Sequence, residues 1–356
     1  MTDTQAAPRR RGKPWIVAVP LILVLALGAC WCGVWFYAAS RAEREIDAWI
    51  ARENLLGRVW SCAERSLGGF PFRFEILCRE PSLVTRGSGD PFRITTANAH
   101  VVAQVWAPNH IVAEFASPAK VEDTATGQVY GATWSLLQMS GIGDMSGTPQ
   151  RISLSVDNPA VQLTPGDTAA APLFTAKHFE AHARRSPAAS NAGPDGVDYA
   201  FGLVDGQNPA LANAGTAGPV NLMLQGSVSA VDNLKPMSVA ERIKAWAAAN
   251  GTLKVDAFQV TTPKAAVSAN GALGVDPQGR LFGAVNIGFA GVDELVKNLA
   301  RSGVIAPEMA SIIGAVAMAG KPGDVAGRKG ATFAITLKDG TVQLGKYPVG
   351  IIPPLF

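Results

Sequence analysis

The sequence predicts a mainly β protein of the α+β class: an N-terminal transmembrane helix, then a large curved antiparallel sheet with a few short helices. Three observations support this. Residues 15–39 contain no charged side chain. Charged residues make up only 17% of the chain, which leaves few for long solvent-exposed helices. From residue 72 onward, segments of alternating polarity rich in Val, Ile, Thr and aromatic residues are separated by turn residues.

The uncharged run at 15–39 is 25 residues long, and about 20 apolar residues suffice to cross a bilayer. Basic residues at 9–11 and 13 precede it, whereas mixed charges follow it. The excess of positive charge before the helix predicts that segment 1–14 is a cytoplasmic tail. We therefore expect a single-pass protein of the inner (cytoplasmic) membrane, with its bulk in the periplasm.

The run at 15–39 has two other possible interpretations, a cleaved signal peptide and a lipoprotein signal. Ala38-Ala39-Ser40 could supply a signal-peptidase site, but the apolar core of a signal peptide is only about 7–15 residues long. Leu27-Gly28-Ala29-Cys30 resembles a lipoprotein signal, yet the apolar run continues beyond the cysteine. An uncleaved anchor is therefore the preferred interpretation.

A helical period continues past the anchor. Ile46, Trp49 and Ile50 are spaced by three and four residues, and Gly57 is a typical helix stop. These residues predict an amphipathic stalk helix over 40–57, followed by a periplasmic antiparallel β-rich domain over 58–356.

The β-rich domain is predicted from alternation and turn chemistry. Hairpin connections rather than βαβ units are expected between the alternating segments 72–78, 92–106, 110–121, 130–139, 151–164, 174–184, 197–204 and 220–231. Ser238 and Glu241 form a capping box, which predicts a helix ending at 250–251.

The C-terminal third continues the pattern. Further strands are expected at 252–262, 264–275 and 280–289, and short helices at 293–301 and 307–319. Asp339-Gly340 between alternating segments predicts a tight hairpin. The apolar terminus 351–356 is expected to dock on the body.

Four cysteines divide into two pairs. Cys30 and Cys32 lie in the predicted anchor and are read as apolar residues. Cys62 and Cys78 lie in the exported part, where an oxidising compartment favours a disulfide worth about 3 kcal/mol on the chain-entropy model.

Catalytic and metal sites are weakly signalled. His178, Glu180 and His182 would share one face of a strand, so a surface metal site is sterically possible. The spacing is not that of a zincin helix, and a plain polar strand face is the preferred interpretation. Neither a nucleophile elbow nor a P-loop is present. We expect no cofactor, no bound metal and no enzymatic activity.

Charge argues against nucleic acid as a partner. The formal net charge is +3, and residues 1–14 already carry all of it, so the remaining chain is balanced. A nucleic-acid binder would need a basic excess on its folded body.

Two features concern apolar contacts. Gly69-Phe70-Pro71-Phe72 forms either a binding loop or a packing element at the start of the sheet, and packing is favoured. Segments such as 100–106 and 220–224 are apolar on both faces of a strand. The second face must be buried against the sheet itself, the membrane surface or a lipid chain.

Several of these local features occur together in a known family. Trp60-Ser61-Cys62, Gly69-Phe70-Pro71-Phe72-Arg73, Cys78 and the terminal Gly350-Ile351-Ile352-Pro353-Pro354-Leu355 resemble the domain of unknown function 2125 family of Gram-negative envelope proteins. The C-terminal order of elements is more loosely similar to AsmA-like envelope proteins, which build curved sheets with an apolar concave face, some linked to lipid traffic. Neither resemblance supplies a catalytic residue.

The sequence thus predicts a membrane-anchored, non-enzymatic periplasmic protein that binds lipid or another apolar ligand along its sheet. A structural or protein-interaction module of the cell envelope, offering a sheet edge to a partner, is the alternative. A metal-dependent hydrolase using His178, Glu180 and His182 is the least favoured hypothesis.

Overall fold

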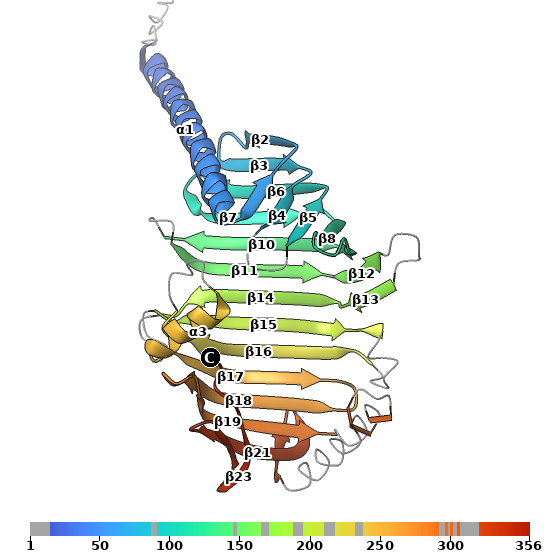
Figure 1. Cartoon of the computed structure of the whole chain (residues 1–356). Coiled ribbons are helices and arrows are strands. Elements are labelled where there is room, and N and C mark those ends of the chain that lie inside the picture. Colours follow the sequence, from blue (N-terminus) through green and yellow to red (C-terminus); the bar gives the residue numbers. More distant parts are fainter. Residues whose placement is uncertain are drawn as a thin grey trace, which may run out of the picture.

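The computed structural model describes residues 15–356 except 87–90, 145–147, 165–170, 188–194, 210–217, 232–237 and most of 292–319. Strands dominate it, and every strand pairing is antiparallel, so the predicted mainly β class is confirmed. Figure 1 shows the strands stacked as a ladder, with helix α1 at one end and β23 at the other. The short helices predicted at 293–301 and 307–319 lie largely outside the described residues.

Helix α1 (Trp15–Leu55) runs without a break across the predicted boundary between anchor and stalk. It stops just before Gly57, whose φ of 78° is readily adopted only by glycine. Within the described part of the chain, this is the one helix with the length and apolar composition needed to cross a membrane.

The larger sheet extends from the end of α1 to the C-terminus. Its strands, in spatial order, are β2 (Glu64–Gly68), β3 (Arg73–Arg79), β6 (Asn98–Gln104), β7 (Ala107–Phe115), β10 (Leu136–Gly143), β11 (Pro149–Asp157), β14 (His178–Arg185), β15 (Val197–Gly206), β16 (Val220–Val228), β17 (Thr252–Thr261), β18 (Ala266–Val275), β19 (Leu281–Ala290), β21 (Arg328–Lys338), β22 (Thr341–Leu344) and β23 (Tyr347–Ile351). Strand β20 (Lys321–Val325) pairs with β21 off this path. At a spacing of about 4.8 Å per strand, the ladder is about 65 Å long.

A second, smaller sheet corrects the expectation of a single one. Its order is β1 (Arg58–Ser61), β4 (Ser82–Thr85), β5 (Phe92–Thr96), β8 (Ala119–Asp123), β9 (Val129–Thr133), β12 (Ala160–Thr164) and β13 (Ala171–Thr175). Each of the segments predicted as one strand at 92–106, 110–121, 130–139, 151–164 and 174–184 is in fact two strands, one in each sheet.

The corners between the sheets have a local cause. Pro81, Pro118 and Pro159 stand at three of them, and proline interrupts a ladder because it has no backbone N–H to donate. Glu80 and Asn158, which precede two of these prolines, have φ values of 48° and 51° that turn the chain. Alternation of polarity continues through such a corner, which is why the sequence reads as one strand.

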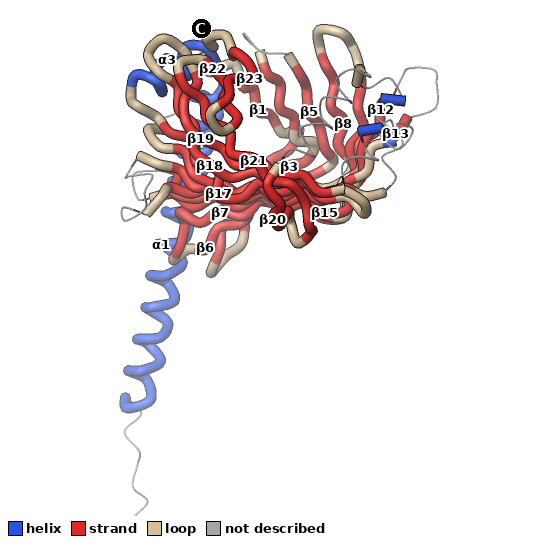
Figure 2. Tube along the Cα trace, turned by 90° about the horizontal axis from the view of Figure 1, so that it is seen from below, coloured by secondary structure: helices blue, strands red, loops and turns tan. Residues whose placement is uncertain are grey.

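The two sheets curve around a common concave side. Figure 2, seen along the ladder, shows the smaller sheet rising on one side and α3, β22 and β23 on the other. The chain exposes 22,646 Å² of surface, whereas a compact protein of this size would expose about 13,600 Å². The architecture is therefore open: among the described residues few are fully buried, and the rest are half-buried or exposed.

Helix α3 (Val239–Ala248) and the C-terminus close one rim of this open shape. The predicted capping box is confirmed, with Ser238 as N-cap and Glu241 as its partner. Trp246 Nε1 donates to the Ser229 carbonyl over 2.8 Å. The terminal segment docks as expected, since the Leu355 N–H donates to the Gly279 carbonyl over 2.8 Å.

The cap of α3 predicts a local acid sensitivity. Hydrogen bonds from Ser238 hold the pKa of Glu241 below its ordinary value of about 4.3. Its stabilising contribution is therefore complete above that value and is lost as the pH falls through the lowered pKa. Hydrogen exchange across 239–248, corrected for intrinsic rates, should accelerate on acidification. Glu241→Gln, which keeps the capping box without the charge, should remove this dependence; an unchanged dependence would contradict the assignment.

Candidate functional site

One face of the larger sheet carries an unbroken apolar row. Residues paired across an antiparallel ladder point to the same side, so the register traces a row from strand to strand. The row contains thirteen residues, one from each strand between β2 and β21: Leu67, Ile76, Val101, Ala113, Met139, Leu154, Ala181, Phe201, Leu224, Phe258, Ala269, Ile287 and Phe333. None of these side chains carries a polar group.

A second row runs beside the first on the same face. It contains Phe74, Ala103, Ile111, Gly141, Ile152, Ala183, Tyr199, Gly226, Val255, Gly271, Val285, Ile335 and Leu344. Its one polar group, the Tyr199 hydroxyl, donates to the Lys254 carbonyl over 3.1 Å. Burial, and to a lesser extent the charge of Asp256, raises the pKa of that phenol. The two rows together are called the apolar face.

The opposite face of the same strands is mixed. Its corresponding row contains Leu77, His100, Glu114, Gln138, Ser155, Glu180, Gly202, Met223, Gln259, Ser268, Gly288 and Thr332. The difference between the faces shows that the period-two alternation of each strand is kept in phase along the whole ladder.

The apolar face is the concave one. Cys78, Ala99 and Val156, which lie on this face at the corner with the smaller sheet, are all less than 10% exposed. A side chain on the inside of a bend is covered by both sheets, whereas one on the outside is not. At the other rim, Ile243 and Trp246 of α3 line a small apolar pocket with Val228 of the same face, and Figure 2 places α3 on the concave side.

The smaller sheet adds an apolar wall. Its cross-strand row is Trp60, Leu83, Ile94, Val121, Tyr130 and Leu163. Ala119, two residues from Val121 on the same face, is 7% exposed at the corner, so this row also faces the inside of the bend. The concave side is thus apolar on two walls.

This concave side is only partly filled. Ile111, Met139, Ile152 and Phe201 are 45%, 39%, 47% and 38% exposed, although all four belong to the apolar face. They lie in two adjacent rows: the first three are on the neighbouring strands β7, β10 and β11, and Phe201 is on β15, separated from β11 by β14. A group of exposed apolar residues of this kind typically marks a binding surface, whereas exposed apolar residues without such a role are usually scattered singly over a protein.

Helix α1 closes the first end of the concave side. Trp35 stacks on Phe74 of the larger sheet with ring centroids 5.8 Å apart, and Trp49 lies 5.6 Å from Trp60 of the smaller sheet. One turn after Trp49 on α1, the Glu53 carboxylate accepts a hydrogen bond from the Arg58 guanidinium over 2.8 Å. The helix therefore contacts both walls where the ladder begins.

The disulfide strengthens the same end. Cys62, between β1 and β2, is bonded to Cys78 of β3 with the two Cα atoms 5.5 Å apart. It ties the first corner to β3, the second strand of the ladder, as the two cysteines predict.

The loop Gly69-Phe70-Pro71-Phe72 lies against α1. Trp31 Nε1 donates to the Pro71 carbonyl over 3.0 Å, and the Phe70 ring lies 5.4 Å from Trp35. Phe70 and Phe72 remain 48% and 59% exposed, so packing accounts for only part of their surface.

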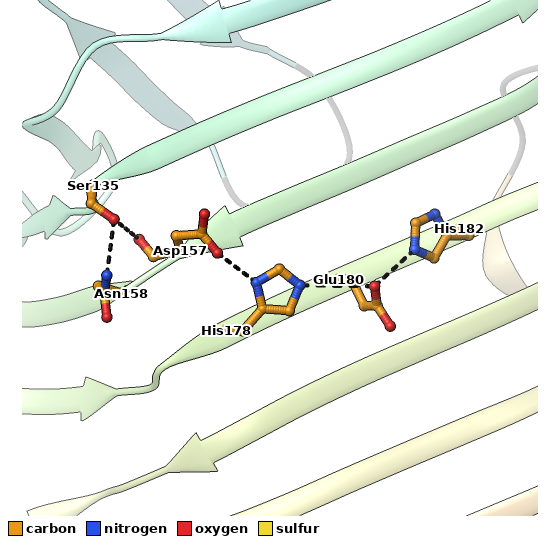
Figure 3. Close-up of polar contacts among 6 residues, drawn as sticks. All are labelled: Ser135, Asp157, Asn158, His178, Glu180 and His182. Atoms are coloured by element: carbon orange, nitrogen blue, oxygen red, sulfur yellow. Dashed lines mark hydrogen bonds and ion pairs between the residues drawn. The ribbon is translucent and has the colours of Figure 1, made fainter.

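The histidine segment lies on the mixed, outer face. Figure 3 shows His178, Glu180 and His182 in a line along β14. His178 Nδ1 lies 2.6 Å from Asp157 Oδ1, and His182 Nε2 lies 3.2 Å from Glu180 Oε2. Within the described residues, no three His, Cys, Asp or Glu side chains are grouped so as to hold a metal ion.

Sequence reasoning missed two parts of this arrangement. Asp157 contacts His178 from the neighbouring strand, 21 residues away, and only the register brings them together. The continuous apolar rows also depend on register. Alternate apolar positions in each strand were the available signal, but they do not say which residue faces which.

Comparison with known proteins agrees with the resemblance seen in the sequence. A family model described as an uncharacterized protein conserved in bacteria (DUF2125) matches residues 35–353. The match therefore begins at Trp35, inside α1, and covers both sheets. No protein with a curated description matches the chain.

Proposed function

Given that the chain belongs to the DUF2125 family of bacterial proteins, we propose that it is a membrane-anchored, non-enzymatic protein that binds lipid acyl chains along its apolar face. In this proposal α1 crosses the cytoplasmic membrane, the tail 1–14 stays in the cytoplasm, and both sheets lie in the periplasm. The Cys62–Cys78 disulfide supports an oxidising compartment for the sheets.

The observation that carries the proposal is the thirteen-residue apolar row. At about 4.8 Å per strand the row is between 55 and 60 Å long, which is about twice the 30 Å thickness of a bilayer's hydrocarbon core. Acyl chains could lie along it end to end. Each CH₂ group removed from water would contribute about 0.8 kcal/mol to binding.

The proposal includes no catalytic step. The histidine and carboxylate side chains of β14 lie on the outer face and interact with one another, whereas the ligand would lie on the concave side. A bound chain would contact aliphatic and aromatic groups only.

Photo-crosslinking tests the proposal directly. A benzophenone amino acid is placed at Phe201, on the apolar face, or at the neighbouring Ala200, which points to the outer face of the same strand. Cells producing the full chain are irradiated, and the purified protein is analysed by mass spectrometry. We expect lipid-mass adducts at position 201, and likewise at Met139 and Ile287, but none at position 200. Equal labelling of both faces, or no lipid adduct in the row, would reject lipid binding.

One observation favours a second function, a protein-interaction module. Strand β23 ends the ladder, and Tyr347, Val349 and Ile351 are 65%, 60% and 82% exposed. An exposed edge strand can pair with a strand of a partner protein. The same benzophenone probe at Val349 distinguishes this case, because protein adducts there without lipid adducts at Phe201 would favour it.

A further inference from the structure

We propose that the loop 69–72 and the turn 105–106 insert into the phospholipid leaflet on the body side of the membrane, so that the ladder begins within the membrane surface. These two segments are called the membrane tip. The inference rests on the proposed function only in that α1 must cross the bilayer. It does not depend on lipid binding along the apolar face.

The depth of the membrane tip follows from the helix. A helix rises 1.5 Å per residue, so a span beginning at Trp15 leaves the 30 Å hydrocarbon core at about residue 35. Trp31 donates to the Pro71 carbonyl over 3.0 Å, and Trp35 donates to the Arg73 carbonyl over 3.2 Å. The loop is therefore held at the depth of the helical turn 31–35, where α1 passes from the hydrocarbon core into the headgroup region.

The side chains of the membrane tip suit that depth. Phe72 and Trp106 are 59% and 66% exposed, with ring centroids 6.5 Å apart. Phe72 ends the loop before β3 and Trp106 lies in the turn between β6 and β7, yet the two rings form one exposed aromatic pair. Aromatic side chains that are not covered by the rest of the protein are favoured at the boundary between headgroups and acyl chains.

Packing within the protein explains only part of the tip. Phe70 lies against Trp35 and Phe36, which holds the loop to the helix. Val105 packs with the cluster of Trp35 and Phe74. Phe72 and Trp106 point beyond this cluster, since more than half of each side chain remains exposed.

Charge marks the limit of the insertion. Arg73 follows Phe72 directly and pairs with Glu75 at 2.6 Å. On the helix, the first charged residue after the apolar run is Arg41, which pairs with Glu45 at 2.6 Å. Charged side chains therefore start just after the aromatic ones on both segments, as expected where headgroups give way to water.

Insertion of the membrane tip would bring the leaflet next to the first residues of the apolar face. Phe74 begins the second apolar row two residues after Phe72, and Leu67 begins the first row just before the loop. A lipid leaving the leaflet at the tip would meet both rows at their first residues.

Depth-dependent quenching tests the inference on the full chain in vesicles of phosphatidylethanolamine and phosphatidylglycerol. An NBD fluorophore is attached to a single free cysteine while the Cys62–Cys78 disulfide is kept. The tip probe is Phe72→Cys in a chain with Cys30→Ala and Cys32→Ala. The anchor probe is the native Cys30 with Cys32→Ala. The distant probe is Ile351→Cys, on β23 at the far end of the ladder, again without Cys30 and Cys32.

Nitroxide lipids labelled near the headgroup are then titrated in. We expect blue-shifted emission and strong quenching at positions 72 and 30, and water-like, unquenched emission at position 351. If position 30 is quenched and position 72 behaves like position 351, the proposed insertion of the tip is wrong, whereas the transmembrane anchor is supported. If position 30 is unquenched, the anchor itself is wrong and the inference fails with it. Trp106→Cys repeats the test from the second segment and must agree with position 72.

Discussion

Replacing Trp35 with alanine is expected to lower the free energy of unfolding by about 3–5 kcal/mol, the usual cost of removing a large buried aromatic side chain. Trp35 is 5% exposed, stacks on Phe74 and contacts Phe70 edge to ring. It also supplies the hydrogen bond to the Arg73 carbonyl. Removing it leaves a cavity between α1 and the first strands. Thermal unfolding of the detergent-solubilised full chain, followed by the β-sheet signal in circular dichroism, measures the effect.

The adjacent Phe36 provides the control. It is 63% exposed, although it also touches the Phe70 ring. Phe36→Ala should therefore cost well under half as much as Trp35→Ala. Equal losses of unfolding free energy would contradict this prediction, because they would mean that the burial of Trp35 adds nothing beyond the ring contacts that both residues make.

Replacing Gly226 with alanine is expected to destabilise the middle of the ladder by about 3 kcal/mol, at the upper end of overpacking costs. A Cβ at this position would lie 2.0 Å from the Lys254 carbonyl oxygen and 2.5 Å from the Tyr199 hydroxyl. The first of these is backbone and cannot rotate away. The strand pair β16–β17 must shift, and the Tyr199 hydrogen bond to Lys254 must break. Chemical denaturation, with hydrogen exchange to localise the loss, measures the result.

Gly141 is a matched control because it lies in the same apolar row, on β10. A Cβ there meets nothing within 4 Å. Gly141→Ala should leave stability unchanged or raise it slightly, since alanine reduces the conformational freedom of the unfolded chain. If both substitutions cost the same, the effect would come from glycine's backbone freedom and not from the close approach at Gly226.

The two glycines also bear on the proposed function. Both belong to the face on which a lipid chain would lie, but only Gly226 is required by the protein's own packing. Gly141 leaves space beside Ile111 and Ile152, which are among the most exposed residues of the apolar face. That part of the ladder is therefore the best place to look for a bound chain.

The sequence by itself determined the kinds of element and their order. The uncharged run at 15–39 predicted the long helix, Ser238 and Glu241 predicted the start of α3, and Asp339-Gly340 predicted the β21–β22 hairpin. Each of these signals is local, because it depends on residues within a few positions of one another. The disulfide was also predictable, since only two cysteines lie outside the apolar run.

The tertiary structure alone decided how these elements combine. Alternation has a period of two and does not specify which strand pairs with which, nor where a strand turns a corner into another sheet. The thirteen-residue row, the contact of His178 with Asp157, and the hydrogen bond from Trp31 to Pro71 all join residues far apart in the chain. The candidate site consists of such long-range juxtapositions, and for that physical reason the sequence showed its apolar residues but not the face they form.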